Sequence, residues 1–163
     1  MNFAELVFWG AFIGLGATVV TDVVGVMRQG WSATHGFYRL VGRWAGSARH
    51  GVLAQGDVRN LEPVRTEAAL GWSAHIALGV VFGIGFVAIF GPDAVTTPDL
   101  ARSLIFGLVT VFIPWLIFQP LFGWGVAMAK ASEPWKMRVK GIITHTIFGF
   151  GLWVSAMVVR FIA

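Results

Sequence analysis

The chain has 163 residues, the size of a single domain, of which 56% are hydrophobic and 12% are charged. In soluble globular domains about a quarter of all residues are charged, so this composition excludes an ordinary soluble domain. The chain contains no cysteine, which excludes disulfides, thiolate metal sites and cysteine nucleophiles. The formal net charge is +4, but the basic residues lie at helix ends and in loops, so we expect no nucleic-acid partner.

Several apolar stretches approach the roughly 20 residues that are needed to cross a bilayer. They predict membrane spans over about 3–27, 68–90, 100–128 and 141–161. Pro114 and Pro120 each remove a backbone donor from the third span and predict kinks there. Residues 37–44 alternate apolar and basic side chains, which predicts a short helix lying in the membrane interface. The predicted fold is all-α: a polytopic membrane protein of four transmembrane helices, in one domain of residues 1–163, with this interfacial helix in the first cytoplasmic loop.

Lysine and arginine concentrate in two of the three predicted loops. Arg28 and five further arginines lie between spans one and two, whereas the opposite side has only Arg102 and Arg160. The loop between spans three and four is also basic, with Lys130, Lys136, Arg138 and Lys140. The positive-inside rule then places both basic loops in the cytoplasm, near anionic lipid headgroups, and both termini on the other side.

Small residues recur every four positions in the spans, which is typical of helices whose backbones pack closely. An ionisable residue interrupts this series in three spans: Asp22 in the first, His75 in the second and His145 in the fourth. Each histidine lies in a Gly-x-x-x-His-x-x-x-Gly pattern. Four-residue spacing keeps such groups on the small-residue face of the helix, so we expect them to point into the bundle.

These polar groups are also predicted to lie at similar depths. At ~1.5 Å of rise per residue, Asp22, His75, His145 and Gln119 lie roughly 8 to 16 Å inside the basic ends of their spans. An ionisable group at membrane depth costs from about 3 kcal/mol upwards and is usually paired or functional. The sequence therefore predicts one convergent site in the cytoplasmic half of the bilayer, with Gln119 and Arg43 as supporting polar groups.

Several roles fit this predicted site. Asp22, His75 and His145 can bind a divalent metal ion, or the two histidines can ligate a haem from opposing helices. The same groups can relay protons in a small transporter. They can also serve only to lock helix packing in an accessory membrane subunit, with Asp22 hydrogen-bonded to a histidine. Glycine faces left over after packing are compatible with a homo-oligomer or a partner in a membrane complex. Because no familiar catalytic motif is present, enzymatic activity stays open.

Five short segments in this order are similar to one family. They are Thr21-Asp22, Leu40-Val41-Gly42-Arg43-Trp44, Gly71-Trp72-x-Ala74-His75-x-x-x-Gly79, Gln119-Pro120-x-x-Gly123 and His145-x-x-Phe148-Gly149-x-Gly151-Leu152. From about Gly14 to the end of the fourth span, the chain resembles the DUF2938 family of bacterial integral membrane proteins. That family has no known function, so the resemblance implies a location in the bacterial inner membrane and no particular activity. With the orientation given by the basic loops, we expect a multi-pass protein with both termini periplasmic.

Overall fold

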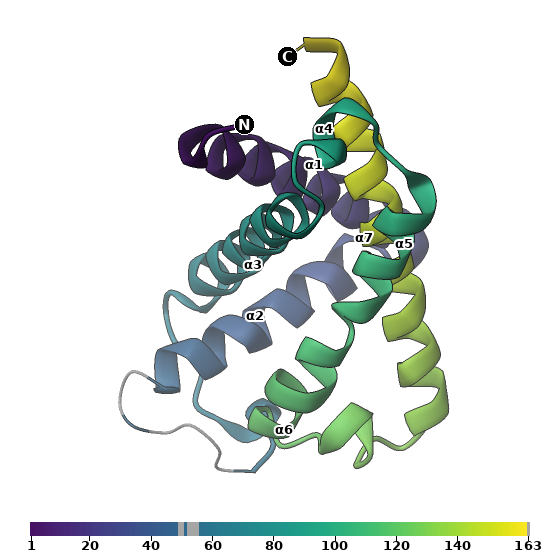
Figure 1. Ribbon diagram of the computed structural model, residues 1–163. Helices are drawn as coiled ribbons and strands as arrows, with labels where there is room; N and C mark the ends of the chain where they lie inside the picture. The colour runs from purple at the N-terminus through teal and green to yellow at the C-terminus, as the bar shows by residue number, and fades with distance from the viewer. Residues whose placement is uncertain (49–50, 52–55, 163) are drawn as a thin grey trace. The chain divides into compact units, whose positions relative to one another are not determined.

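The computed structural model describes residues 1–48, 51 and 56–162, and the described residues contain helices and no β-strand. Arg49, one of the five loop arginines, lies outside this part. In chain order the elements are α1 (Phe3–Gln29), α2 (Trp31–Ala48), η1 (Val58–Asn60), α3 (Glu67–Phe90), α4 (Asp93–Thr96), α5 (Leu100–Val109), η2 (Pro114–Phe118), α6 (Gln119–Leu121), η3 (Val126–Met128) and α7 (Pro134–Ile162) (Figure 1). Of the short elements, η1 and η3 are 3₁₀ turns, whereas η2 is a π-helical turn.

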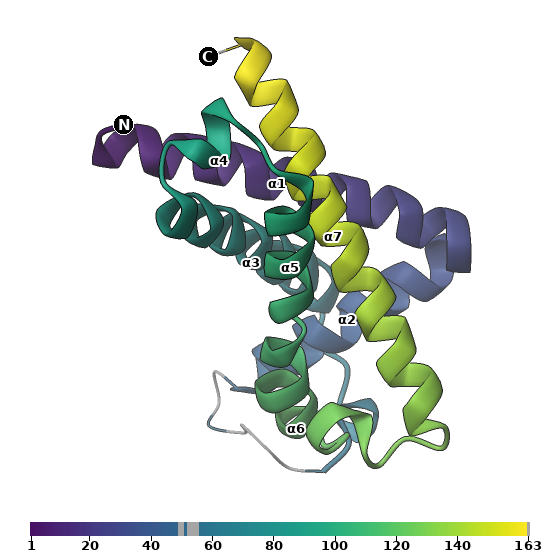
Figure 2. The ribbon, with the colours of Figure 1, turned by 45° about the vertical axis from the view of Figure 1, so that its right-hand side comes forward.

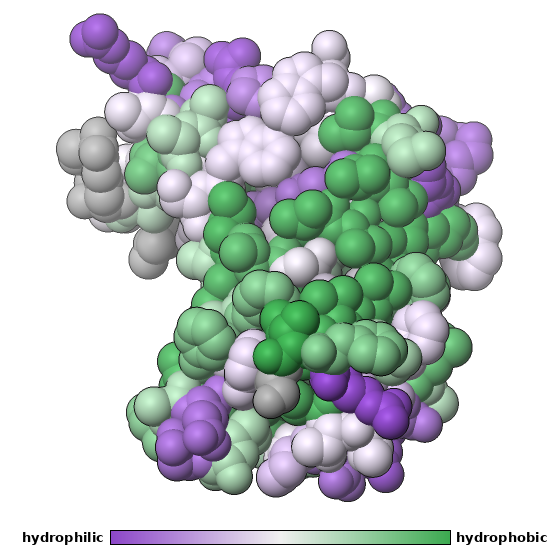
Figure 3. Space-filling view, turned by 90° about the horizontal axis from the view of Figure 1, so that it is seen from above, coloured by the Kyte–Doolittle hydropathy of each residue, from purple (hydrophilic) through white to green (hydrophobic). Residues whose placement is uncertain are grey.

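Four helical stretches are long and apolar enough to cross a membrane: α1, α3, α7 and the stretch Leu100–Leu121 that contains α5 and α6. The predicted all-α fold with four membrane-spanning helices is therefore confirmed. Large apolar side chains are exposed along the spans, and Figure 3 shows them over much of one face. On α1 they recur every three or four residues, as in a helix with one lipid-facing side, at Phe8, Phe12, Leu15, Val19 and Val23.

Two helices differ in their ends from the predicted spans, and one predicted helix is longer than expected. The helical stretch of the third predicted span ends at Leu121, seven residues before the predicted limit of 128, because Gly123 and Gly125 have positive φ angles of 81° and 74° that end the helix. The fourth begins at Pro134 instead of residue 141, since proline fits the first turn of a helix. The helix in the first loop is confirmed but is not short: α2 has 18 residues and buries Thr34, Tyr38, Gly42 and Gly46 along one face.

Contacts group the chain into two compact units, each of which is described by itself. Unit 1 comprises Met1–Gly25, Ile76–Thr110 and Ile143–Ala163, and unit 2 comprises Val26–His75 and Val111–Ile142. The prediction of a single domain over residues 1–163 stays a prediction.

Unit 1 is held together by helices whose backbones touch at glycine. A Cβ atom at Gly14 of α1 would lie 2.2 Å from the carbonyl oxygen of Gly79 in α3, and one at Gly107 of α5 would lie 2.5 Å from Gly149 of α7. Figure 2 shows α5 running beside α7. The predicted packing of small-residue faces is therefore confirmed at these two crossings. Around them lies an apolar core that includes Ile13, Ala17, Phe86, Val87, Leu152 and Ala156.

In unit 2, α2 crosses the first turns of α3 at a second glycine contact. A Cβ atom at Gly42 would lie 1.7 Å from the carbonyl oxygen of Glu67, and one at Gly71 would lie 1.7 Å from that of Tyr38. Only glycine permits so close an approach of two backbones. This contact, which we call the α2–α3 crossing, brings the side chains beside these glycines within hydrogen-bonding range of one another.

Candidate functional site

The sequence-predicted site residues are divided between the two units. Asp22 and His145 belong to unit 1, whereas Arg43, His75 and Gln119 belong to unit 2. Asp22 is half-buried in α1 and directly follows the buried Thr21. Within the described ranges, no group of three or more histidine, aspartate or glutamate side chains is placed to hold a metal ion. The convergence of these residues on one site stays a prediction.

His145 is fixed by a hydroxyl group of the neighbouring helix. Its Nδ1 lies 2.8 Å from the Thr110 hydroxyl, which donates its proton to the carbonyl oxygen of Gly107 at 2.6 Å. A threonine hydroxyl has only one proton, so we infer that Nδ1–H of His145 is the donor to the Thr110 oxygen. In the neutral ring, Nε2 then carries the lone pair.

His75 lies in the α2–α3 crossing against an aromatic ring. Its Nε2 is 2.9 Å from the Tyr38 hydroxyl, and the two rings stack with centroids 4.2 Å apart. One turn away, the indole N–H of Trp72 donates to Nδ1 of His35 at 3.1 Å. Sequence analysis missed the roles of Tyr38 and His35, which lie on the same face of α2 as the buried Gly42 and Gly46, because His35 precedes the helix predicted over residues 37–44.

Arg43 is paired with an acid that sequence analysis treated only as the start of a span. The Glu67 carboxylate, in a residue that is 3% exposed, accepts hydrogen bonds from Nε of Arg43 at 2.9 Å and Nε of Arg39 at 2.7 Å. It also accepts from the backbone N–H of Val64, which precedes the helix, at 3.4 Å. Two cations and one amide therefore satisfy a carboxylate that is almost fully buried.

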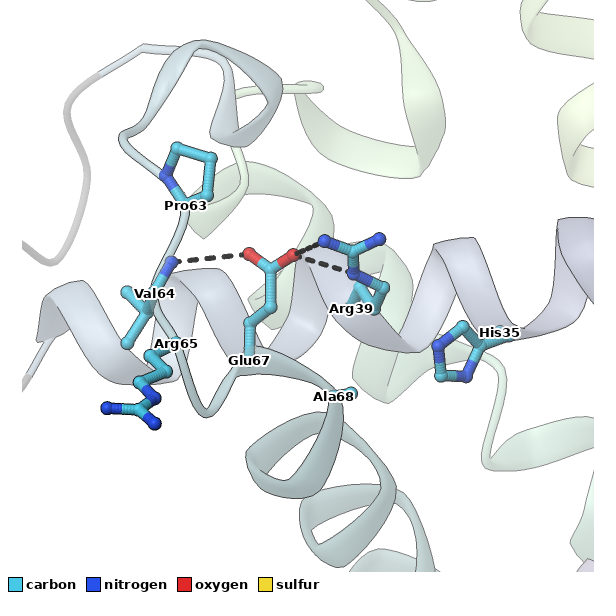
Figure 4. Close-up of a pocket in the computed structure, with 7 residues that line it drawn as sticks. All are labelled: His35, Arg39, Pro63, Val64, Arg65, Glu67 and Ala68. Atoms are coloured by element: carbon cyan, nitrogen blue, oxygen red, sulfur yellow. Dashed lines mark hydrogen bonds and ion pairs between the residues drawn. The ribbon is translucent and has the colours of Figure 1, made fainter.

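Beside this cluster lies an open cleft of about 500 Å³. Figure 4 shows Glu67 at its wall, with Arg39 on one side and Val64 on the other. Its lining residues are His35, Arg39, Pro63, Val64, Arg65, Glu67 and Ala68. Since the Glu67 charge is already matched within the wall, Arg39 and the exposed Arg65 leave the cleft positive. The cleft can therefore accept an anion.

Gln119 directly follows the π-helical turn η2. Its side-chain oxygen is buried and has no hydrogen-bond partner within the described part of the chain, and the same is true of the indole nitrogen of Trp115. The sequence had identified Gln119 as a polar group inside the span, but it gave no reason to select Trp115 among eight tryptophans.

A chain with four helices long and apolar enough to cross a membrane, and with a cluster of arginines around a buried glutamate, is a polytopic membrane protein. More specifically, it belongs to the DUF2938 family of proteins of unknown function, whose model matches residues 11–159. This match confirms the resemblance found in the sequence. No curated protein and no solved structure matches the chain.

Proposed function

We propose that this protein binds a phosphate-bearing lipid headgroup in the cleft beside Glu67, at the cytoplasmic surface of a bacterial inner membrane. The observation that carries the proposal is the buried ion-pair cluster. Because Glu67 fixes Arg39 by hydrogen bonds, the guanidinium is held at the cleft before any ligand arrives. An arginine that is already ordered loses less side-chain entropy on binding than a free one.

Arg39 has N–H groups that remain available to donate hydrogen bonds to a ligand. A guanidinium has five N–H groups, and Arg39 directs its Nε and Nη2 atoms at Glu67. Its side chain is 49% exposed, in contrast to 14% for Arg43. Arg65 adds a second exposed guanidinium, and the ring of His35 adds a donor, because its Nδ1 accepts from Trp72 and leaves the proton on Nε2. Guanidinium groups suit phosphate oxygens because their planar donors match them in pairs.

The surroundings of the cleft favour a lipid over a soluble anion. Trp31 stacks on His35 with ring centroids 5.5 Å apart and is 58% exposed. Tryptophan is enriched at membrane interfaces, where its ring meets the headgroup region. Basic residues near an anionic leaflet each contribute about 1 kcal/mol to attraction for the surface. A headgroup in the cleft would therefore have an apolar neighbour for its acyl chains.

The test compares lipid dependence in two matched variants. Protein in mild detergent is supplemented with short-chain phosphatidylglycerol, with short-chain phosphatidylcholine, or with inorganic phosphate, and its thermal unfolding is followed. We expect phosphatidylglycerol to raise the melting temperature in the parent and in Arg28→Gln, but not in Arg65→Gln, because Arg28 is exposed outside the cleft. Equal stabilisation by phosphatidylcholine would contradict anion recognition. Full stabilisation by inorganic phosphate would indicate a soluble anion instead.

The intramembrane site of Asp22, His75 and His145 is a second proposal, and one observation supports it. The inferred proton on Nδ1 of His145 leaves Nε2 with a lone pair, and this is the arrangement of a histidine that binds a metal ion or a haem iron. Such a group would supply Lewis-acid or redox chemistry.

An absorption spectrum and a metal analysis of the protein purified in mild detergent test this second proposal. A Soret band, or a stoichiometric transition metal that is lost in His145→Ala and His75→Ala, would support it. A colourless, metal-free preparation would contradict it and favour the proton relay or the packing role.

A further inference from the structure

We propose that the π-helical turn of the third span contains a binding site for a single hydroxyl group, provided by a water molecule or by a small alcohol, between Trp115 and Gln119. The site lies in unit 2 and shares no residue with the cleft. It rests on contacts that the proposed function does not use.

The two polar atoms are complementary. The indole Nε1 of Trp115 can only donate a hydrogen bond, and the side-chain oxygen of Gln119 can only accept one. Both atoms are buried and lack a partner within the described residues. Buried polar groups are nearly always paired, by protein or by an ordered small molecule, because an unpaired group has lost its water without compensation. A hydroxyl group satisfies both atoms, since it accepts one hydrogen bond and donates another.

The backbone explains why two such atoms occur four residues apart on a membrane helix. Gln119 donates its N–H to the carbonyl oxygen of Pro114, a bond over five residues that widens the turn. Pro114 and Pro120 have no N–H of their own, so the regular α-helical pattern cannot continue through this segment. Widened turns of this kind are rare and are found frequently at functional sites.

Gly141 lies close to the indole nitrogen of Trp115. A Cβ atom at Gly141 of α7 would lie 3.2 Å from Nε1 of Trp115. Any larger residue at this position would press on the N–H group and take the place of a ligand. Gly141 is therefore a position at which one added methyl group would disturb the indole nitrogen.

Nuclear magnetic resonance of the tryptophan indole groups tests the proposal. The full chain is labelled with ¹⁵N-tryptophan in detergent micelles, and Trp115→Phe assigns the Trp115 signal. We expect that signal at the position of a hydrogen-bonded indole, close to that of Trp124, whose Nε1 donates to Asp57 at 3.1 Å. Gly141→Ala and Gln119→Leu are each expected to move the Trp115 signal towards that of an unbonded indole, and to leave Trp124 unchanged.

The same spectra identify the source of the hydroxyl. A cross-peak from the Trp115 N–H to the water resonance indicates water. Cross-peaks to non-exchangeable protons, with an alcohol recovered by solvent extraction of the parent but not of Gly141→Ala, indicate an organic ligand. A Trp115 signal that lies at the unbonded position in the parent, or that neither variant moves, would overturn the proposal.

Discussion

Glu67 begins a membrane-spanning helix with its carboxylate buried, and two features of its surroundings permit this. It lies at the N-terminus of α3, where the helix dipole favours a negative charge. It also accepts hydrogen bonds from two arginines of α2. A charge buried with such partners is stable, whereas the same charge without them would be strongly unfavourable.

Glu67→Gln is therefore expected to destabilise the protein. The change removes the charge but keeps the shape, and it leaves Arg43, which is 14% exposed, without its counter-charge. Breaking a buried pair in this way costs about 3 kcal/mol. Thermal unfolding in mild detergent, followed by near-ultraviolet circular dichroism, measures the loss. The exposed neighbour Glu62 provides the control, and an equal effect of Glu62→Gln would show that the pairing is unimportant.

Asp57 gives a pH dependence with a defined direction. Hydrogen bonds from Arg59 hold the pKa of this carboxyl below its ordinary value of 3.8. Asp57 therefore binds a proton more readily in the unfolded chain, so its contribution to stability is complete above pH 3.8 and is lost as the pH falls further.

We expect Asp57→Asn to reduce this loss of stability at acid pH. Between about pH 5 and about pH 3 the melting temperature of the variant should fall less than that of the parent. The parallel variant Asp93→Asn is the control, because Asp93 is exposed at the start of α4, in a different part of the chain. If the melting temperature fell equally with pH in the parent and in Asp57→Asn, Asp57 would not be the source of the pH dependence.

At the scale of the helix, the sequence predicted which segments are helical more accurately than it predicted where those helices end. Spans were recognised because apolar runs of this length have no other common explanation. The end of the third span was placed too late because Val126 and Met128 continue the apolar run past Gly123 and Gly125. Glycine also occurs within membrane helices as a packing residue. The sequence therefore does not tell a helix-ending glycine from one that packs.

The crossing of α1 and α3 can be tested by adding one methyl group. A Cβ atom at Gly83 would lie 2.3 Å from the carbonyl oxygen of Gly10, so Gly83→Ala must push the two helices apart. We expect a loss of about 1–3 kcal/mol in thermal unfolding. At Gly85 the nearest atom to such a Cβ is Cζ of Phe106 at 3.8 Å, an ordinary contact.

Gly85→Ala is thus the matched control for this crossing. Replacing glycine by alanine inside a helix is favourable by roughly 0.5–1 kcal/mol when space permits, so this variant should be as stable as the parent or slightly more stable. If both variants behaved alike, the effect of Gly83→Ala would reflect helix propensity and not backbone contact.

For the whole molecule, the structure shows two contacts of the predicted polar residues that the sequence did not anticipate. His75 contacts Tyr38, a residue that the sequence did not single out, and its predicted convergence with Asp22 and His145 stays a prediction. Arg43 pairs with Glu67, which sequence analysis treated only as the start of a span, and its supporting role at the intramembrane site stays a prediction. Both contacts depend on how α2 is oriented where it packs against α3. Composition and spacing carry no information on that orientation, so these contacts required coordinates.

The orientation in the membrane can be measured directly because the chain has no cysteine. Single cysteines are introduced at Asp93 and at Glu133, which lie on different loops and are both exposed. The positive-inside rule predicts that a membrane-impermeant maleimide added to intact cells labels Asp93→Cys and not Glu133→Cys. After the cells are lysed, both should react. The reverse pattern in intact cells would invert the proposed topology and place the cleft outside the cytoplasm.

The α2–α3 crossing also bears on the order of events during synthesis. Arg43 and Glu67 are separated by 24 residues along the chain, and Tyr38 and His75 by 37. Contacts that are this local form early, because only a short loop has to close. The charges of α2 and α3 can therefore neutralise each other as soon as the start of the second span leaves the ribosome, before α5 and α7 have been translated. An acidic residue at the leading end of a span would then enter the lipid surface already paired.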